Sequence, residues 1–339
     1  MALLKYFGVL SFLAIAACCW QASGADNVTS REASLNTDSY AASSQNKARP
    51  RIGLALGGGG ARGAAHVGVL KVLTEEGVPI DMIAGTSIGS VVGGFYAAGV
   101  PLDVLAKQFE KGTFMKKFMP FPLFTQILIE PIAFSPRLVG RHPYDGLYGR
   151  KETAKFGRNL EGNAPMEIEH LPVRFSAVCT NLVDGQPYSI SEGDLVSSIM
   201  ASTAVPGIKK PVQIGDHLFC DGGVVCNIPV DQVRAMGADF VIAVDIDERL
   251  GSKSLDKFRV PGSVSKQALR IKLADDDRPA CKAADVVIHP NLDGIDLISR
   301  KKKDGRRGVE AGVTAAREAL PEIKRKLAAL GMVIPAKSE

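Results

Sequence analysis

A serine flanked by glycines stands where a buried strand would give way to a helix. The segment Gly85-Thr86-Ser87-Ile88-Gly89 fits G-x-S-x-G, the pattern of a nucleophile held on a sharp turn. The apolar run Met82–Ala84 precedes it, and residues 90–98 follow with the spacing of a helix. A Cβ at Gly85 or Gly89 would strike the adjoining strand or helix. The pattern predicts a hydroxyl raised at the positive end of a helix, although a chance glycine-serine turn is the competing interpretation.

A serine needs a base, because it is a weak nucleophile at its own pKa. None of the histidines is a convincing base: His66 lies inside the first predicted helix, His142 and His170 precede any plausible triad order, and His217 and His289 lie in contexts without other catalytic features. Asp221-Gly222-Gly223 is more suggestive, because it follows the apolar pair Leu218-Phe219 and would present a carboxylate at a strand end beside glycines. An Asp followed by Gly is also ordinary turn chemistry. The residues alone therefore leave both interpretations of Asp221 open.

A run of glycines supplies backbone donors ahead of the serine. Gly57-Gly58-Gly59-Gly60-Ala61-Arg62-Gly63 leaves the apolar run Ile52–Leu56 and opens a helical pattern over residues 65–73. Unpaired N–H groups at the start of a helix converge where an anion can sit. We expect the amides of Gly58, Gly59 and Gly60 to form an oxyanion hole for ester cleavage, in which one good donor contributes roughly 3–4 kcal/mol.

The same glycines also fit a dinucleotide-binding fingerprint, through Gly58, Gly60 and Gly63. The acidic residue expected to bind the ribose would be Asp81, but it stands before the second strand and not at its carboxyl end. No Lys follows the run as a P-loop requires. A G-x-S-x-G one strand later favours the oxyanion interpretation.

Strands and helices alternate along much of the chain. Strands are predicted at 52–56, 82–84, 173–178 and 240–244, and helices at 65–73, 90–98, 195–201 and 230–236. This rhythm predicts an α/β fold, a three-layer sandwich in which a mainly parallel sheet carries helices on both faces.

Taken together, the glycine loop with Arg62, the Gly85–Gly89 turn and Asp221-Gly222-Gly223 resemble the three signature blocks of the patatin-like phospholipase family, in the family's order. The resemblance covers roughly residues 50–250. Ala201–Gly207 and Asn227–Pro229 are similar to segments that line the site in bacterial members. Plant members carry an acidic residue where this chain has Gly57, a position that affects only the support of the loop.

The resemblance implies a catalytic dyad of Ser87 and Asp221 without histidine, and calcium-independent cleavage of lipid acyl esters with no cofactor or metal. It also implies that Arg62, with Gly63, supports the glycine loop. A carboxylate of ordinary pKa near 4 accepts protons poorly at neutral pH, so we expect Asp221 to be partly desolvated. The expected reaction is of the phospholipase A or lysophospholipase type. The alternatives are a hydrolase of short esters or acylated proteins, and a non-catalytic nucleotide- or lipid-binding protein.

The first residues read as a targeting segment. Lys5 precedes an apolar run over residues 7–17, which is too short to span a bilayer. Residues 1–25 are therefore predicted to be a signal peptide. We favour a lipobox cut before Cys18, after Ile15-Ala16-Ala17, over ordinary cleavage near Ala22-Ser23-Gly24. The protein is then expected to be exported to a bacterial cell envelope and anchored to a membrane by a lipid on Cys18.

The remaining boundaries follow from composition. Residues 26–49 are polar and predict a flexible linker. A catalytic domain is expected over residues 50–295, with a cap inserted around 100–165, and a basic helical extension over 296–339. Aromatic residues and methionines in the insertion either line a trough for acyl chains or form an ordinary packed cap; they are Phe114, Met115, Phe118, Met119, Phe121 and Phe124.

Charge and cysteine usage exclude some classes of protein. The net charge of +5 lacks the dense positive field of a nucleic-acid binder. The basic run Lys301–Arg307 either contacts anionic lipid headgroups or is a solvated face. Cys179, Cys220, Cys226 and Cys281 show no zinc spacing, and a Cys220–Cys226 disulfide is left open because export would permit one. The sequence does not predict an oligomeric state.

Overall fold

The computed structural model describes residues 49–112, 115, 144, 166–251, 254–260 and 262–335. Residues from Pro50 onward belong to one compact unit. The predictions for the signal peptide, Cys18, the linker and most of the inserted cap lie outside the described residues, and they stay predictions.

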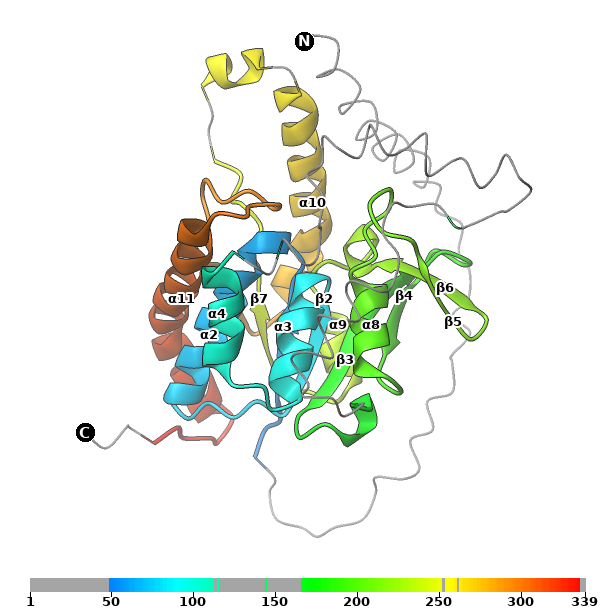
Figure 1. The fold of residues 1–339 in the computed structure, drawn as a ribbon. Helices are drawn as coiled ribbons and strands as arrows, with labels where there is room; N and C mark the ends of the chain where they lie inside the picture. The colour runs from blue at the N-terminus through cyan, green and yellow to red at the C-terminus, as the bar shows by residue number, and fades with distance from the viewer. Residues whose placement is uncertain are drawn as a thin grey trace. The chain divides into compact units, whose positions relative to one another are not determined.

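A central sheet organises the described residues (Figure 1). It has eight strands in the order β5-β6-β3-β2-β1-β7-β8, with β4 paired to β3. The strands are β1 (Ile52–Leu56), β2 (Met82–Thr86), β3 (Arg174–Asn181), β4 (Pro187–Ile190), β5 (Val212–Ile214), β6 (His217–Asp221), β7 (Phe240–Val244) and β8 (Val286–Ile288). Five of them, from β3 through β2, β1 and β7 to β8, are joined by parallel pairs. The predicted mainly parallel sheet is confirmed.

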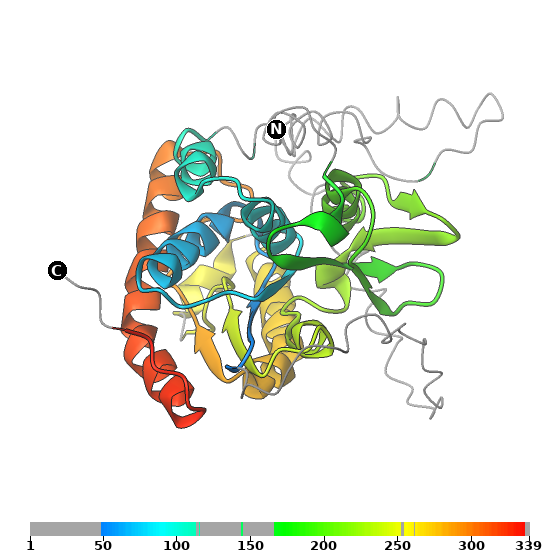
Figure 2. The ribbon, with the colours of Figure 1, turned by 90° about the horizontal axis from the view of Figure 1, so that it is seen from below.

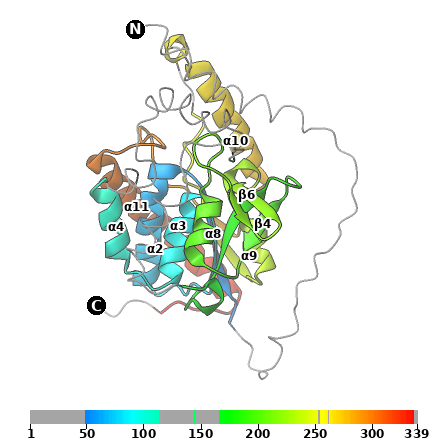
Figure 3. The same cartoon turned by 45° about the vertical axis from the view of Figure 1, so that its right-hand side comes forward.

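Helices cover both faces of this sheet. They are α2 (Ala64–Glu75), α3 (Ile88–Ala97), α4 (Leu102–Glu110), α8 (Leu195–Ser202), α9 (Val230–Ala235), α10 (Ser263–Ala283) and α11 (Lys302–Ala329), with 3-10 turns η1 (Gly60–Gly63), η2 (Ile168–His170), η3 (Gly222–Val224) and η4 (Leu255–Arg259). Figure 3 shows α8 next to α3. None of the described helices combines the length and hydropathy of a membrane-spanning segment.

Alternate residues of β1 enter two separate cores. Ile52, Leu54 and Leu56 pack into the larger core, with side chains of α2, α3, α8 and α11. Ala55 packs on the other face, with residues of β7 and α9. Because strand side chains alternate between faces, two cores on one strand make three layers, and the predicted sandwich is confirmed.

The C-terminal helix is part of this unit. Figures 1 and 2 show α11 alongside α2. The contact is close because a Cβ at Gly312 would lie 2.1 Å from the carbonyl oxygen of Ala65, and one at Gly68 would lie 2.1 Å from that of Val309. Ile323 and Leu327 are fully buried. Residues from Pro50 onward, α11 included, belong to the same compact unit, and the boundary predicted at residue 296 stays a prediction.

The four cysteines of the described residues are free thiols, two buried and two half-buried. The disulfide between Cys220 and Cys226 that the sequence left open is therefore absent. Cys220 lies in β6, and Cys226 follows η3. The thiol of Cys226 contacts the side-chain oxygen of Gln232 at 3.2 Å instead.

Candidate active site

Strand register brings Ser87 and Asp221 together across 134 positions of sequence. Thr86, the last residue of β2, pairs with Val178 of β3, and the next residue of β3, Cys179, pairs with Asp221 at the end of β6. Ser87 follows β2 directly, so its side chain emerges beside the Asp221 carboxylate. The Ser87 Oγ donates a hydrogen bond to Asp221 Oδ2 at 2.7 Å. The predicted contact between the two side chains is present.

Ser87 occupies a strained turn. Its φ of 51° makes it the one non-glycine residue with positive φ among the described residues, a conformation that costs about 1–3 kcal/mol. A Cβ at Gly85 would lie 2.5 Å from the backbone of Gly89, and one at Gly89 would lie 2.1 Å from the carbonyl oxygen of Leu56. Both glycines are therefore required, as the sequence pattern predicted.

Ser202, a buried residue at the end of α8, holds this turn in place by hydrogen bonds. Ser202 Oγ accepts the Ser87 N–H at 2.9 Å and donates to the Val178 carbonyl at 2.7 Å. Ser90 Oγ donates to the Ser87 carbonyl at 2.6 Å. These bonds fix the backbone on both sides of the Ser87 side chain, so its direction toward Asp221 is preset.

The Asp221 carboxylate is buried and held at both oxygens. Only 6% of the residue is exposed. Besides accepting from Ser87, it accepts the Gly223 N–H at Oδ1 at 2.9 Å. Burial raises its pKa from 3.8 to about 6, and the hydrogen bonds from Ser87 and Gly223 and the charge of Lys209 only partly oppose that rise. The expected desolvation is present, and it makes Asp221 a better proton acceptor than an exposed Asp.

The glycine loop after β1 lies against this pair, since a Cβ at Gly58 would lie 3.4 Å from the Ser87 Cβ. One of the three expected oxyanion donors is already engaged: the Gly58 N–H donates to Asn227 Oδ1 at 3.1 Å. Gly59 and Gly60 have φ of 151° and 58°, and their N–H groups donate to no acceptor within the described residues. The Gly58 N–H is thus engaged in this structure, whereas those of Gly59 and Gly60 are available to an acceptor, and the oxyanion hole stays a prediction.

The buried side chain of Arg62 anchors the glycine loop to neighbouring segments. Its guanidinium is almost fully buried; Nε donates to the Ile295 carbonyl at 2.8 Å, and Nη2 pairs with Glu248 at 3.0 Å. Gly63 lies against Ile88 so closely that a Cβ would lie 2.1 Å from that side chain. Gly222 is equally confined, because a Cβ there would lie 2.2 Å from the Val178 carbonyl oxygen. Gly223 contributes its N–H to Asp221.

His66 is structural and not a base of the site. Its Nε2–H donates to the Gly57 carbonyl at 2.8 Å, and complete burial lowers its pKa to about 4. Asp81 accepts the Ile52 N–H at 2.7 Å. It therefore lies at the amino end of β1, whereas the glycine loop follows the carboxyl end of the same strand. A nucleotide on that loop could not also reach Asp81, because a five-residue strand spans about 17 Å.

Residues 54–234 match the sequence model of the family described as patatin-like phospholipase, a span that holds the glycine loop, Ser87 and Asp221. The chain belongs to the patatin-like phospholipase family.

Relatives of this patatin-like chain include bacterial and fungal proteins. An uncharacterized NTE family protein of Mycobacterium tuberculosis is 35% identical over 201 residues, which cover 58% of this chain and 49% of the relative. Lysophospholipase nte1 of Aspergillus fumigatus is 34% identical over 198 residues, 58% of this chain and 12% of the relative. The chain thus spans at most about half the length of these curated relatives.

Among solved structures, human GIVD cytosolic phospholipase A2 in complex with methyl gamma-linolenyl fluorophosphonate is similar to this chain. It is 12% identical, with a TM-score of 0.46, and the match covers 85% of this chain and 60% of that one.

Asp247 and Asp277, which are linked to the glycine loop through Asn227, were not predicted as site residues. Asn227 Nδ2 donates to Asp277 Oδ2 at 2.9 Å and to Asp247 Oδ2 at 3.2 Å. Burial raises the pKa of Asp277 to about 7 and that of Asp247 to about 6, and the nearby charge of Asp245 adds to both shifts. Asp247 follows the carboxyl end of β7 closely, and this position in the sequence could have marked it as a candidate site residue. Asp277 lies inside α10, where no local sequence pattern distinguishes it.

Lys209 is a second residue that the sequence did not single out. It is buried, and its Nζ donates to Thr203 Oγ1 at 3.2 Å. Burial lowers its pKa to about 7, while the negative charge of Asp221 opposes that shift. The same turn holds Asp221 in place, since the Asp221 N–H donates to the Ala204 carbonyl at 3.0 Å.

Proposed function

We propose that this protein hydrolyses acyl esters of lipids, as a phospholipase A or lysophospholipase, with Ser87 as nucleophile and Asp221 as its base. The single observation that supports this most strongly is the 2.7 Å hydrogen bond from the hydroxyl of Ser87, on its strained turn, to a desolvated carboxylate. Family membership and the relative named as a lysophospholipase support the lipid ester as substrate class.

Acylation begins when Ser87 Oγ attacks the ester carbonyl carbon and its proton passes to Asp221 Oδ2. The carbonyl electron pair moves to the oxygen, and the N–H groups of Gly59 and Gly60 stabilise that charge. Breaking the carbon–oxygen bond expels the alcohol, which takes the proton from Asp221. The fatty acyl group remains as an ester of Ser87.

Deacylation repeats these steps with water. The water oxygen attacks the acyl carbon while Asp221 accepts a proton from that water, and the same glycine amides stabilise the second oxyanion. When the intermediate collapses, the Ser87 oxygen recovers the proton from Asp221 and the fatty acid leaves. No histidine is needed, because the raised pKa of Asp221 lets one carboxylate both accept and return the proton.

A panel of substrates tests the reaction and separates it from its alternative. The purified full chain is incubated with a diacyl phospholipid, the corresponding lysophospholipid and a short-chain ester, and the products are identified by mass spectrometry. We expect fatty acid release from one or both phospholipids, and none from the Ser87→Ala variant. Cleavage confined to the short ester would instead support a short-ester hydrolase.

We further propose that the protein is exported and anchored by an acyl chain on Cys18. The lipobox-like sequence before that residue supports this proposal. Cells expressing the full chain with a clickable fatty acid should incorporate the label into the wild type but not into Cys18→Ser. Incorporation that survives this substitution would contradict the anchor, whereas a matched Cys19→Ser variant should keep the label.

A further inference from the structure

An exposed segment is fixed directly to the glycine loop. The Leu297 carbonyl accepts the Ala61 N–H at 2.7 Å, and a Cβ at Gly60 would lie 2.3 Å from the same oxygen. The side chains of Leu297 and Ile298 are each 45% exposed although both are large and apolar. This segment enters α11, whose first two turns carry a cluster of cations. The basic shelf is defined here as Leu297, Ile298, Lys301, Lys302, Lys303, Arg306 and Arg307.

The packing of α11 forces its cations outward. Gly305 and Gly308 face the body of the domain, where Cβ atoms would lie 2.2 Å from the Phe109 carbonyl oxygen and 2.8 Å from the Ala64 Cβ. At about 100° per residue, Lys303 and Arg306 then lie on the opposite side of the helix, and both are exposed. The shelf is therefore a face held in one orientation.

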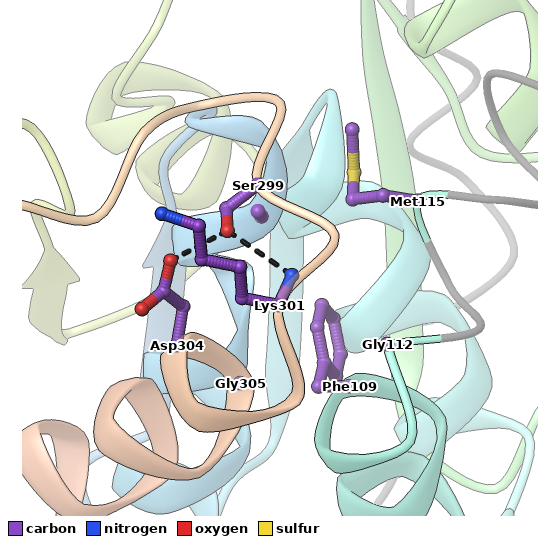
Figure 4. Close-up of a pocket in the computed structure, with 8 residues that line it drawn as sticks. Phe109, Gly112, Met115, Ser299, Lys301, Asp304 and Gly305 are labelled. Atoms are coloured by element: carbon purple, nitrogen blue, oxygen red, sulfur yellow. Dashed lines mark hydrogen bonds between the residues drawn. The ribbon is translucent and has the colours of Figure 1, made fainter. Parts of the chain in front are cut away.

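A small cavity beneath the shelf shows how its turn is held (Figure 4). Ser299 Oγ donates to Asp304 Oδ2 at 2.5 Å and accepts the Lys301 N–H at 3.3 Å. Phe109 and Met115 line the other side of the cavity. The Asp304 carboxylate is buried, and the one shelf cation with which it forms an ion pair among the described residues is Arg307, at 3.9 Å.

The charge arrangement works against helix stability. Lys302 and Arg306, like Lys303 and Arg307, are one turn apart and repel each other, and all four stand at the helix end where the dipole disfavours cations. In the described part of the chain, no acidic side chain lies within salt-bridge distance of Lys301, Lys302, Lys303 or Arg306. An external anionic surface would remove this repulsion.

The shelf and the candidate active site open at the same edge of the sheet. Ser87 follows the carboxyl end of β2, and the segment leading to the shelf follows the carboxyl end of β8, which is parallel to β7, β1 and β2. The other end of α11 lies at the opposite edge, because a helix of this length spans roughly 40 Å. A flat surface that contacts the shelf therefore faces the Ser87 edge.

We propose that the basic shelf binds the surface of an anionic lipid bilayer and turns the Ser87 edge of the sheet toward it. Cations suited to phosphate headgroups and two exposed apolar side chains suited to the interface stand together, as in a membrane-surface site. The proposal deepens the proposed function, since it names the surface from which the substrate is taken.

Vesicle binding tests this without catalysis. All variants carry Ser87→Ala and Cys18→Ser in the full chain, so that no substrate is consumed and no acyl chain on Cys18 contributes. Binding is measured by co-sedimentation with vesicles of phosphatidylcholine alone and of phosphatidylcholine mixed with phosphatidylglycerol, over a range of salt. The shelf variant is Lys302→Gln/Lys303→Gln. Its matched control, Arg317→Gln/Arg325→Gln, removes two exposed cations from the far half of the same helix.

The unsubstituted shelf should bind phosphatidylglycerol vesicles in a salt-sensitive manner and phosphatidylcholine vesicles weakly. Because each cation near an anionic leaflet contributes roughly fivefold, the shelf variant should bind roughly 25-fold more weakly, while the control should change less than about twofold. Equal losses in both variants, or equal binding to both kinds of vesicle, would overturn the proposal. Tighter binding to duplex DNA than to vesicles would overturn it in favour of a nucleic-acid surface. Unchanged circular dichroism of the variants shows that folding is intact.

If the panel of substrates shows no hydrolysis while vesicle binding behaves as stated, the proposed function fails and the membrane role of the shelf stands. If lipids are hydrolysed but binding does not depend on the shelf, the membrane role fails and the proposed function stands.

Discussion

Asn227 connects Gly58 to Asp277 through the two ends of one side-chain amide. Its oxygen accepts the Gly58 N–H at 3.1 Å, and its nitrogen donates to Asp277 at 2.9 Å. Because the Gly58 N–H and the amide nitrogen are both donors, the amide oxygen must face the loop while the nitrogen faces the two acids. The position of the glycine loop beside Ser87 thus depends on an acid in α10.

Replacing Asn227 should therefore impair catalysis more than folding. In Asn227→Leu, the Gly58 N–H loses its side-chain acceptor and keeps only the longer 3.4 Å bond to the carbonyl of residue 227, and a poorly satisfied buried donor of this kind costs about 1–3 kcal/mol. We expect kcat/KM for ester cleavage to fall roughly ten- to hundredfold, mainly through kcat, since the loop carries the oxyanion donors. Asn291→Leu, at an exposed turn, serves as the control. Equal kinetics in both variants would show that Asn227 has no positioning role.

Asp221→Asn should remove activity and increase stability at neutral pH. The folded-state pKa of about 6 lies above the ordinary 3.8, so the folded protein binds the proton more tightly and loses stability as pH rises between these values. The ionised carboxylate then costs roughly 3 kcal/mol above about pH 7. Thermal unfolding should show the variant to be more stable there, with the difference shrinking toward about pH 4. A difference independent of pH would contradict the buried, titrating carboxylate.

Lys209→Met should move the acidic limb of the activity profile. The positive charge of Lys209 lowers the pKa of Asp221, and activity requires the ionised base. Removing that charge raises the pKa further, so kcat/KM should begin to fall at a higher pH than in the wild type. Lys210→Met removes a neighbouring, more exposed charge and should leave the limb in place. An unshifted limb in Lys209→Met would rule out this coupling.

Gly89→Ala should destabilise the Ser87 turn. Its Cβ would lie 2.1 Å from the Leu56 carbonyl oxygen, and the β1 backbone cannot yield without disturbing the sheet. Overpacking of this kind costs typically about 1–3 kcal/mol or more, and denaturant unfolding should detect it. Gly251→Ala is the control, because a Cβ there meets nothing within 4 Å. Comparable stability of the two variants would mean that the turn is looser than these contacts imply.

The sequence predicted the elements whose signal is local. β1 and β7 have the expected bounds, because continuous apolar runs ending in glycine or aspartate leave little choice. Ser87 could be identified because the steric needs of its turn dictate Gly85 and Gly89. Asp221 could be chosen over the histidines only through the resemblance to a family, since an Asp-Gly pair is also common in turns.

What remained hidden depends on contacts between distant segments. Asp277 is one of three consecutive acids in α10, and nothing local distinguishes the one that reaches Asn227. The commitment of the Gly58 N–H to Asn227 follows from the placement of two loops 169 positions apart. The integration of α11 depends on Gly308 and Gly312, whose role is visible only once α2 lies against them.

Active-site labelling tests the central claim, that Ser87 is a nucleophile activated by Asp221. The full-chain wild type, Ser87→Ala and Asp221→Asn are treated with a fluorophosphonate probe, and the modified peptide is identified by mass spectrometry. We expect a single modification on Ser87 in the wild type, none in Ser87→Ala and only weak labelling in Asp221→Asn. Labelling that persists in Ser87→Ala, or that is undiminished in Asp221→Asn, would contradict the claim.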